Sequence, residues 1–148
     1  MNDLFDSGSV SQILERLYSL EPGQPPRWGK MSAAQMLRHC QAPFTVYFGE
    51  LKLKQSFAGL LFGRIAKRKL FSDKPWPQGL PTAREFVVAD DHEFDTERDR
   101  LAALIERFSG SSILLHAPHH PFFGKMSAQD WSRLAWKHLD HHLRQFGV

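Results

Sequence analysis

Apolar side chains recur every three or four residues along much of this chain, which is the spacing of an amphipathic α-helix. A first helix is predicted from Ser9 up to the turn that begins at Glu21. A second should begin after Ser32, a good N-cap, because Gln35 follows three residues later as in a capping box. Pro43 should kink this helix or end its regular part, since proline lacks the N–H that the helix needs. The apolar stripes are Val10, Ile13, Leu14, Leu17 and Tyr18 in the first helix and Met36, Leu37, Cys40 and Phe44 in the second.

Three further helices are predicted in the rest of the chain. One covers residues 53–71 and is apolar on one side and cationic at its end. The next covers residues 94–108, before Gly110, and the last runs from a cap at Ser127 to about Phe146. Residues 72–92 contain three prolines, so we expect a long ordered loop there with one short extended piece in the sequence EFVVAD. The pattern predicts an all-α fold.

Composition indicates one soluble domain over residues 1–148. Hydrophobic residues make up 42% and charged residues 24%, as in ordinary globular proteins. The net charge of +3 is too small to indicate a nucleic-acid partner. The single cysteine, Cys40, excludes an intramolecular disulfide and suits a reducing cytosol. Because the N-terminus has no signal pattern and no apolar stretch approaches membrane-spanning length, we expect a cytoplasmic protein.

The pentapeptide Gly-Lys-Met-Ser-Ala occurs twice, at residues 29–33 and 124–128. Each copy has a glycine in the entry loop and a serine at the helix cap, so both mark a helix start. Counted from these serines at about 100° per residue, His39, His138 and His142 point to about −20°, +20° and +60°. The three imidazoles therefore leave their helices on similar faces, and they can converge inside a bundle.

Converging imidazoles are typical of a metal site. His138 and His142 lie one turn apart, about 5–6 Å between Cβ atoms, which suits two ligands of one divalent metal. His39 would complete a set of three, with the remaining positions open to water or substrate as in catalytic sites. With eight histidines in 148 residues, such a pair also arises by chance. Spacing alone therefore leaves metal binding and ordinary packing both open.

Several segments resemble one known group of proteins. A helix-borne histidine in SAAQMLRHC and the C-terminal HLDHHLRQF are similar to motifs of the DinB/YfiT-like superfamily, whose members are regarded as metalloenzymes. Within it, WGKMS, SDKPWPQGLPTAREFVV, HPFFGKMS and HLDHHLRQFGV resemble a branch classified only as a domain of unknown function. The segment Leu143-Arg144-Gln145 departs from the commoner R-G-Q ending.

The resemblance implies a four-helix bundle with a long crossover and a nickel or zinc ion held by His39, His138 and His142. It also implies activation of a thiol, because the superfamily includes low-molecular-weight-thiol transferases. One expectation is therefore a metal-dependent transferase or hydrolase that activates a thiol or water. The alternative is a non-catalytic metal-binding or stress-associated bundle. The expected partner is a small-molecule substrate such as a low-molecular-weight thiol, without nucleic acid or membrane, and a homodimer is compatible with the sequence.

Two further histidine features invite a chemical role. His120 precedes the last helix and is predicted to border the metal pocket as a catalytic proton carrier or substrate contact. A separate metal site made by His116, His119 and His120 is disfavoured, because no regular element would fix its geometry. His141 should pack outside the ligand set, since it points about 100° away from its neighbour His142.

The remaining candidates have plainer interpretations. Asp140 is expected in solvent, and Cys40 is expected to pack as a small buried residue rather than act as a nucleophile. The cationic segment GRIAKRKLF could touch an anionic membrane or nucleic acid, but a solvated helix face is the preferred interpretation. No phosphate-binding loop, dinucleotide-binding glycine pattern or CxxC motif is present in the sequence.

Overall fold

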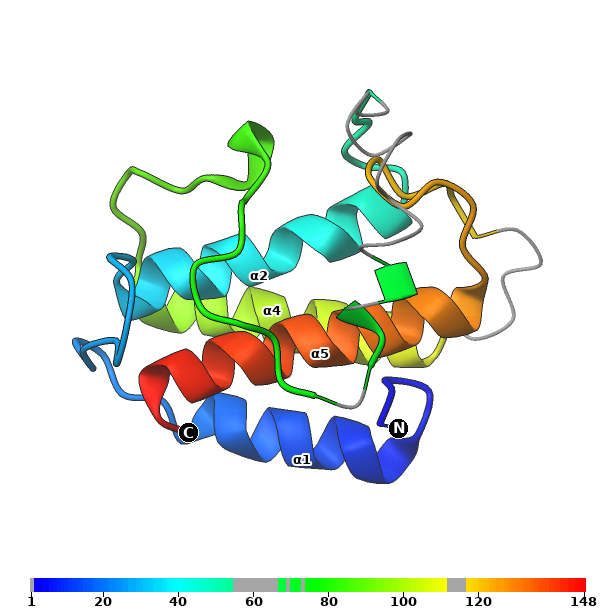
Figure 1. Ribbon diagram of the computed structural model, residues 1–148. Helices are drawn as coiled ribbons and strands as arrows, with labels where there is room; N and C mark the ends of the chain where they lie inside the picture. The colour runs from blue at the N-terminus through cyan, green and yellow to red at the C-terminus, as the bar shows by residue number, and fades with distance from the viewer. Residues whose placement is uncertain (1, 55–66, 69, 73, 112–116) are drawn as a thin grey trace.

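The computed structural model describes residues 2–54, 67–68, 70–72, 74–111 and 117–148. These residues contain four longer helices and one 3-10 turn, which are α1 (Ser7–Tyr18), α2 (Ala33–Tyr47), η1 (Arg84–Phe86), α4 (Phe94–Ser109) and α5 (Ala128–Phe146) (Figure 1). The predicted all-α four-helix bundle is confirmed. Most of the helix expected over residues 53–71 lies outside the described residues. None of the helices in the described ranges is long and apolar enough to cross a membrane.

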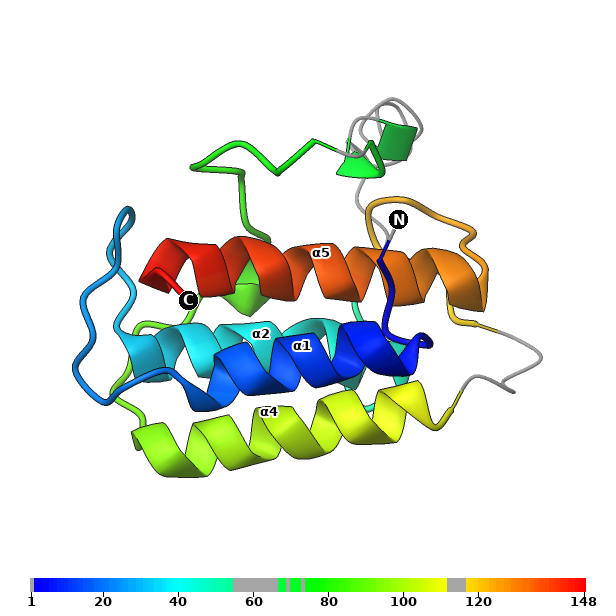
Figure 2. The same cartoon turned by 90° about the horizontal axis from the view of Figure 1, so that it is seen from below.

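Each bundle helix packs against two others. Both α1 and α2 contact α4 and α5, and they lie between α5 and α4 in the side view of the bundle (Figure 2). The helices α2 and α4 run in the same direction, and α1 and α5 run in the opposite one (Figure 1). The chain must therefore return along the bundle between α2 and α4, which is the predicted long crossover. Residues 74–92 of this crossover pass over the side of α2 and α5 that faces away from α4 (Figures 1 and 2).

The two copies of Gly-Lys-Met-Ser-Ala both start helices, as predicted. Ser32 accepts a hydrogen bond from the backbone N–H of Gln35, and the Gln35 side chain accepts one from the Ser32 N–H. Ser127 and Asp130 form the same reciprocal capping box at the start of α5. These contacts satisfy N–H groups that a helix N-terminus otherwise leaves unpaired. The first helix instead begins two residues before the predicted start, because Asp6 caps it.

Pro43 lies inside α2, and the helix continues beyond it to Tyr47. Of the two outcomes predicted for Pro43, the end of the regular helix was therefore wrong, and a kink stays a prediction. Three of the residues that follow it are buried, namely Phe44, Val46 and Tyr47. The rings of Phe44 and Tyr47 lie 5.5 and 4.6 Å from the ring of Phe108 on α4. This packing offsets the helical hydrogen bond that the proline cannot donate.

The segment EFVVAD does not form a strand. Its first two residues belong to the 3-10 turn η1, and no strand occurs in the described part of the chain beyond one isolated bridge between His120 and Gly124. A lone extended segment has no partner for ladder hydrogen bonds. The Phe86 carbonyl has a different role, because it accepts a hydrogen bond from the imidazole of His39.

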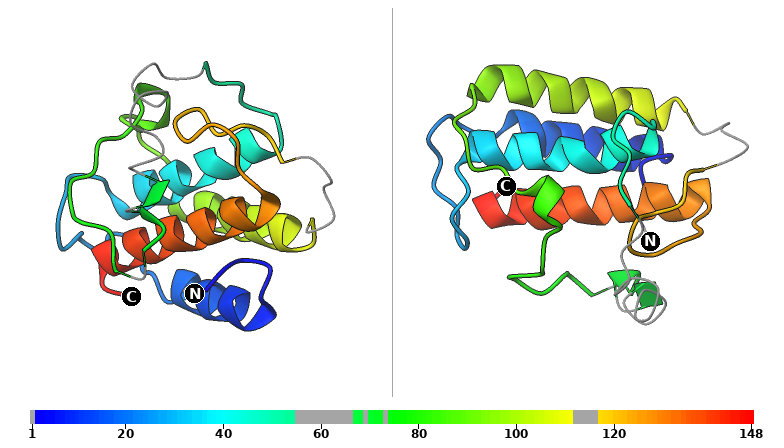
Figure 3. Two further views of the ribbon diagram at one scale, coloured as in Figure 1. Left: turned by 45° about the vertical axis from the view of Figure 1, so that its right-hand side comes forward. Right: turned by 90° about the horizontal axis from the view of Figure 1, so that it is seen from above.

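The bundle core takes fully buried side chains from all four helices. The loop of residues 19–32 between α1 and α2 lies at the same end of the bundle as the C-terminus of α5 (Figure 3). It is tied there by hydrogen bonds from the Arg27 N–H to the Gln145 carbonyl and from the Gln24 side chain to the Phe146 carbonyl. The largest core side chains include Ile13, Leu17, Leu37, Phe44, Leu101, Ile105, Phe108, Trp131 and Leu139.

Candidate metal centre

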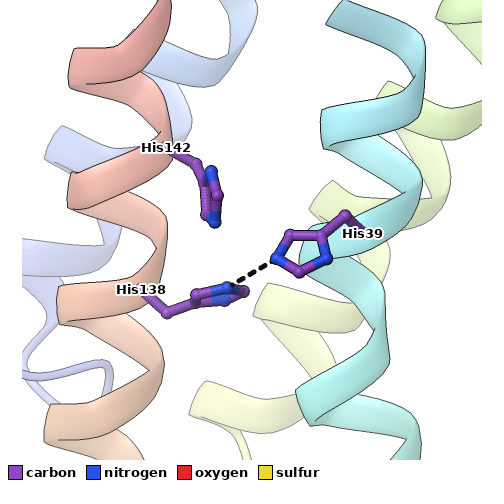
Figure 4. Close-up of side chains that lie close together, drawn as sticks. All are labelled: His39, His138 and His142. Carbon is purple, nitrogen blue, oxygen red and sulfur yellow. Dashed lines mark hydrogen bonds between the residues drawn. The ribbon is translucent and has the colours of Figure 1, made fainter. Parts of the chain in front are cut away.

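The helices α2 and α5 bring His39, His138 and His142 together (Figure 4). His39 comes from α2, and the other two lie one turn apart on α5. Their ring centroids are 4.6 to 5.0 Å apart, and one ligand nitrogen from each ring lies within 4.8 Å of the others. The convergence predicted from the helix faces is confirmed.

Hydrogen bonds behind two of the rings hold their inner nitrogens toward the common centre. His39 Nδ1 donates to the Phe86 carbonyl at 2.9 Å, and a carbonyl can only accept. His142 Nδ1 contacts the side-chain oxygen of Gln145 at 2.8 Å. The amide of Gln145 is itself oriented, because its nitrogen donates to the Trp28 carbonyl at 2.7 Å. Both rings therefore carry their proton on Nδ1, which leaves the Nε2 lone pair for a ligand.

The donor set fits a divalent transition metal. The Nε2 atoms of His39 and His138 are 3.0 Å apart. Two imidazoles bound to one metal at about 2.0–2.1 Å would place these atoms roughly 2.8–3.4 Å apart for coordination angles between about 90° and 109°. Without a cation, this contact requires a proton on one of the two nitrogens, and that proton would have to be on Nε2 of His138, because His39 holds its own proton on Nδ1.

Burial keeps the three imidazoles neutral. It lowers the pKa of His39, lowers that of His142 to about 3, and lowers that of His138 well below its usual value. For His138 and His142, the charges that neighbouring histidines would carry lower the pKa further. A neutral imidazole is the form that binds a metal, so protons compete weakly with a cation at neutral pH.

The rings of Trp76 and His141 lie beside the three-histidine group. The Trp76 ring lies 6.1 Å from the ring of His138 and 5.9 Å from that of His141, and its indole N–H donates to the Leu70 carbonyl. His141 packs between Trp28, at 5.7 Å, and His142, at 5.1 Å. It does not belong to the group of three, which agrees with the packing role predicted for it.

A family model described as "Protein of unknown function (DUF1569)" matches residues 5–147. The chain belongs to this family. The match includes all four bundle helices and the three-histidine group of this DUF1569 chain. No curated protein and no solved structure matches it. Its chemistry therefore has to be inferred from the side chains themselves.

His120 of the DUF1569 chain lies near the first turn of α5. Its ring packs 5.0 Å from Trp131 and 4.5 Å from Phe123, and its Nδ1 accepts hydrogen bonds from the backbone N–H groups of Phe122 and Phe123. Trp131 precedes His138 by seven residues, which is about 10 Å along a helix. The structure does not bring His120 into the three-histidine group, and its catalytic role stays a prediction.

Asp140 is buried, so the prediction that it lies in solvent was wrong. Its carboxylate accepts from Arg16 of α1 at 2.8 Å and from Arg144, one turn further along α5, at 3.0 Å. The helix wheel places Asp140 away from the face of α5 that carries His138 and His142. The helix α1 packs against this other face of α5, and a helix wheel does not give such a neighbour.

Cys40 is fully buried, as predicted, and its thiol contacts the sulfur of Met36 at 3.6 Å. Burial raises the pKa of this thiol, which argues against a nucleophile. Of the disfavoured second metal site, His116 lies outside the described residues and His119 is exposed. Most of the cationic segment also lies outside them, although Lys67 forms an ion pair with Asp130 at 2.7 Å.

Gln145 and Phe86 are the functional residues that the sequence analysis missed. Gln145 follows His142 by three residues, and this spacing places two side chains together on a helix, so the contact could have been found. The Phe86 carbonyl had no comparable signal, because it reaches His39 only through the path of the crossover.

Proposed function

We propose that this protein is a metal-dependent enzyme in which His39, His138 and His142 hold one divalent transition metal, nickel or zinc. The observation that carries this proposal is the orientation of three neutral imidazoles toward one point, two of them fixed from behind by hydrogen-bond acceptors. Catalytic zinc sites typically have three protein ligands and keep a position open, whereas structural sites use four. The group found among the described residues has three members.

A metal bound there would lower the pKa of a water or thiol that reaches it and so supply a nucleophile for hydrolysis or group transfer. The resemblance to the DinB/YfiT-like superfamily supports a low-molecular-weight thiol as substrate, and a cytoplasmic location would keep such a thiol reduced. The other residues at the site hold the ligand rings in position. The Phe86 carbonyl and the Gln145 amide hold two rings, while Trp76 covers His138 from the crossover.

A non-catalytic metal-binding bundle is the second candidate. It is supported by the fact that the ligands come from two different helices, since His39 lies on α2 and the other two histidines lie on α5. A metal at this place would cross-link two helices of the bundle and stabilise the folded state by mass action. The two candidates share the metal site and differ in turnover.

Elemental analysis of untagged protein tests the metal site. We expect about one nickel or zinc ion per chain in the wild type and a large loss in His142→Ala, because two imidazoles hold a metal more weakly than three. His119→Ala is the matched control, since it removes an exposed histidine of a loop. A wild-type protein with no affinity for zinc or nickel would overturn the proposal.

Turnover then separates the two candidates. The enzyme should couple a thiol to an electrophile, lose this activity on chelation and regain it when zinc or nickel is added back. A protein that binds one metal, melts at a lower temperature without it and turns over none of several thiols would be the non-catalytic bundle.

A further inference from the structure

A pocket of about 320 Å³ lies beside the metal centre. Its size is within the range of small-ligand sites. Its lining residues come from the 19–32 loop, the crossover and the last turns of α5. Its walls include Arg27, Trp28, Trp76, Asp140, His141 and Arg144.

The pocket and the metal centre share part of their walls. Trp76 lines the pocket, and its ring also lies 6.1 Å from that of His138. His141 lines it as well, with its ring 5.1 Å from that of His142. A ligand in this pocket would therefore lie next to the three imidazoles, with these two rings between.

The charge of the pocket favours an anion. Two arginines and one carboxylate line it, and these three groups carry a net charge of +1. The carboxylate of Asp140 is already paired, because it accepts from Arg16 as well as from Arg144. It therefore repels an incoming anion less than an unpaired carboxylate would.

Contacts with the protein hold the two guanidinium groups in place, and some of their N–H donors remain for a ligand. Within the described part of the chain, the ion pair of Arg144 uses Nε, so its terminal nitrogens remain for another acceptor. Arg27 donates from one terminal nitrogen to the Gly147 carbonyl at 3.3 Å. Its guanidinium also lies over Gly147, where an added Cβ would be 2.7 Å from it. Guanidinium forks of this kind match the oxygens of carboxylates and phosphates.

We propose that this pocket binds a small organic oxyanion, a carboxylate or phosphate monoester attached to a flat apolar body. Arg27 and Arg144 bind the anionic group, while the indoles of Trp28 and Trp76 pack against the body. If the metal centre has the proposed function, this anionic group is the charged end of its substrate, and this assignment rests on the proposed function. The binding itself does not, because the pocket walls contain none of the three ligand imidazoles.

Calorimetric titration of the full chain with phenyl phosphate and with benzoate tests this proposal, and it is done with metal-free and with zinc-loaded protein. At least one of the two probes should bind in both states, and neutral benzyl alcohol should bind at least about tenfold more weakly than that probe. The stronger of the two anions identifies the preferred oxyanion. Arg144→Gln and Arg27→Gln should each weaken binding about tenfold, which is the effect of one charge-assisted contact.

Arg107→Gln is the matched control. Its side chain is 55% exposed against 54% for Arg144, it is also ion-paired, and it lies on α4, on the opposite side of the bundle (Figure 2). This substitution should leave the affinity unchanged. No binding of either anion, or equal weakening by Arg107→Gln and Arg144→Gln, would overturn the pocket.

Metal content measured on the same samples separates the two proposals. A normal metal content without oxyanion binding overturns the pocket alone. Arginine-dependent oxyanion binding by a protein that cannot hold zinc or nickel supports the pocket and overturns the proposed function.

Discussion

Gly29 lies directly against the side-chain amide of Gln145, and a Cβ added to this glycine would stand 2.7 Å from the amide nitrogen. That nitrogen donates to the Trp28 carbonyl, and the amide oxygen contacts Nδ1 of His142. The glycine also has a φ of 81°, which L side chains rarely adopt. The first copy of Gly-Lys-Met-Ser-Ala thus does more than start a helix, because its glycine leaves room for the group that orients a candidate metal ligand.

Gly29→Ala should therefore weaken both folding and metal binding. Gly23→Ala is the matched control, since Gly23 has a φ of 79° in the same loop and nothing within 4 Å of an added Cβ. Both variants should lose about 1–2 kcal/mol of unfolding free energy for the left-handed backbone. Only Gly29→Ala should lose more than this and also bind zinc more weakly, as measured by urea unfolding and by chelator competition. Equal losses in the two variants would show that Gln145 can move aside without consequence.

Gln145→Ala tests the same support from the other side. Removing the acceptor behind His142 should lower the affinity for zinc about 10- to 100-fold, which is the usual effect of losing a group that orients a metal ligand. Gln129→Ala makes the same change near the start of α5, where Gln129 donates to Asp3, and should leave zinc affinity unchanged. Nitrogen chemical shifts of His142 would report the tautomer directly. A variant that keeps both the affinity and the Nδ1–H tautomer would contradict this role of Gln145.

Much of the bundle could be predicted from the sequence because its signals are local. The capping boxes at Ser32 and Ser127 and the apolar stripes that follow them depend on residues a few positions apart. The convergence of the three histidines could be predicted for the same reason. Two helices that begin with the same cap share a reference angle, so the faces of His39 and His138 can be compared before the fold is known.

The contacts behind the histidines could not be predicted in this way. The Phe86 carbonyl reaches His39 across 47 positions of sequence, and Arg16 reaches Asp140 across 124. A helix wheel gives the direction of a side chain from its own axis but not the element that packs there. Asp140 was therefore expected in solvent, although α1 lies against that face of α5.

Asp140→Ala should destabilise the bundle, because this carboxylate joins α1 to α5. Its side chain is 13% exposed and that of Arg16 is 20% exposed, so the pair is shielded from water. Removing it leaves Nη1 of Arg16 without its carboxylate acceptor, while Nη2 keeps the Val148 carbonyl, and should cost about 1–3 kcal/mol of unfolding free energy. Asp99→Ala removes an exposed partner of Arg98 on α4 and should cost no more than about 0.5 kcal/mol. Urea unfolding of both variants measures the difference, and similar values would mean that the α1–α5 pair contributes no more than a surface pair.

His120 should make the stability of the protein depend on pH. Burial lowers the pKa of this imidazole to about 4. Its Nδ1 accepts from two backbone N–H groups, at 3.1 and 3.2 Å, and a proton added there would displace both. The unfolded chain takes up this proton as pH falls below about 6.5, whereas the folded protein does not until about pH 4. The unfolded state then binds more protons, so the unfolding free energy decreases as pH falls through this window.

His120→Asn isolates this contribution, because an asparagine oxygen can accept the same two hydrogen bonds but does not titrate. Between pH 6.5 and 4, metal-free wild-type protein should lose stability more steeply than the variant, by up to about 1.4 kcal/mol per pH unit, the slope of one proton. His119→Asn removes an exposed imidazole from the same loop and serves as the control. The buried imidazoles of the metal centre add the same slope to all three proteins and cancel in the comparison. Parallel curves for the wild type and His120→Asn would show that the folded protein accepts a proton at His120 as readily as the unfolded chain does.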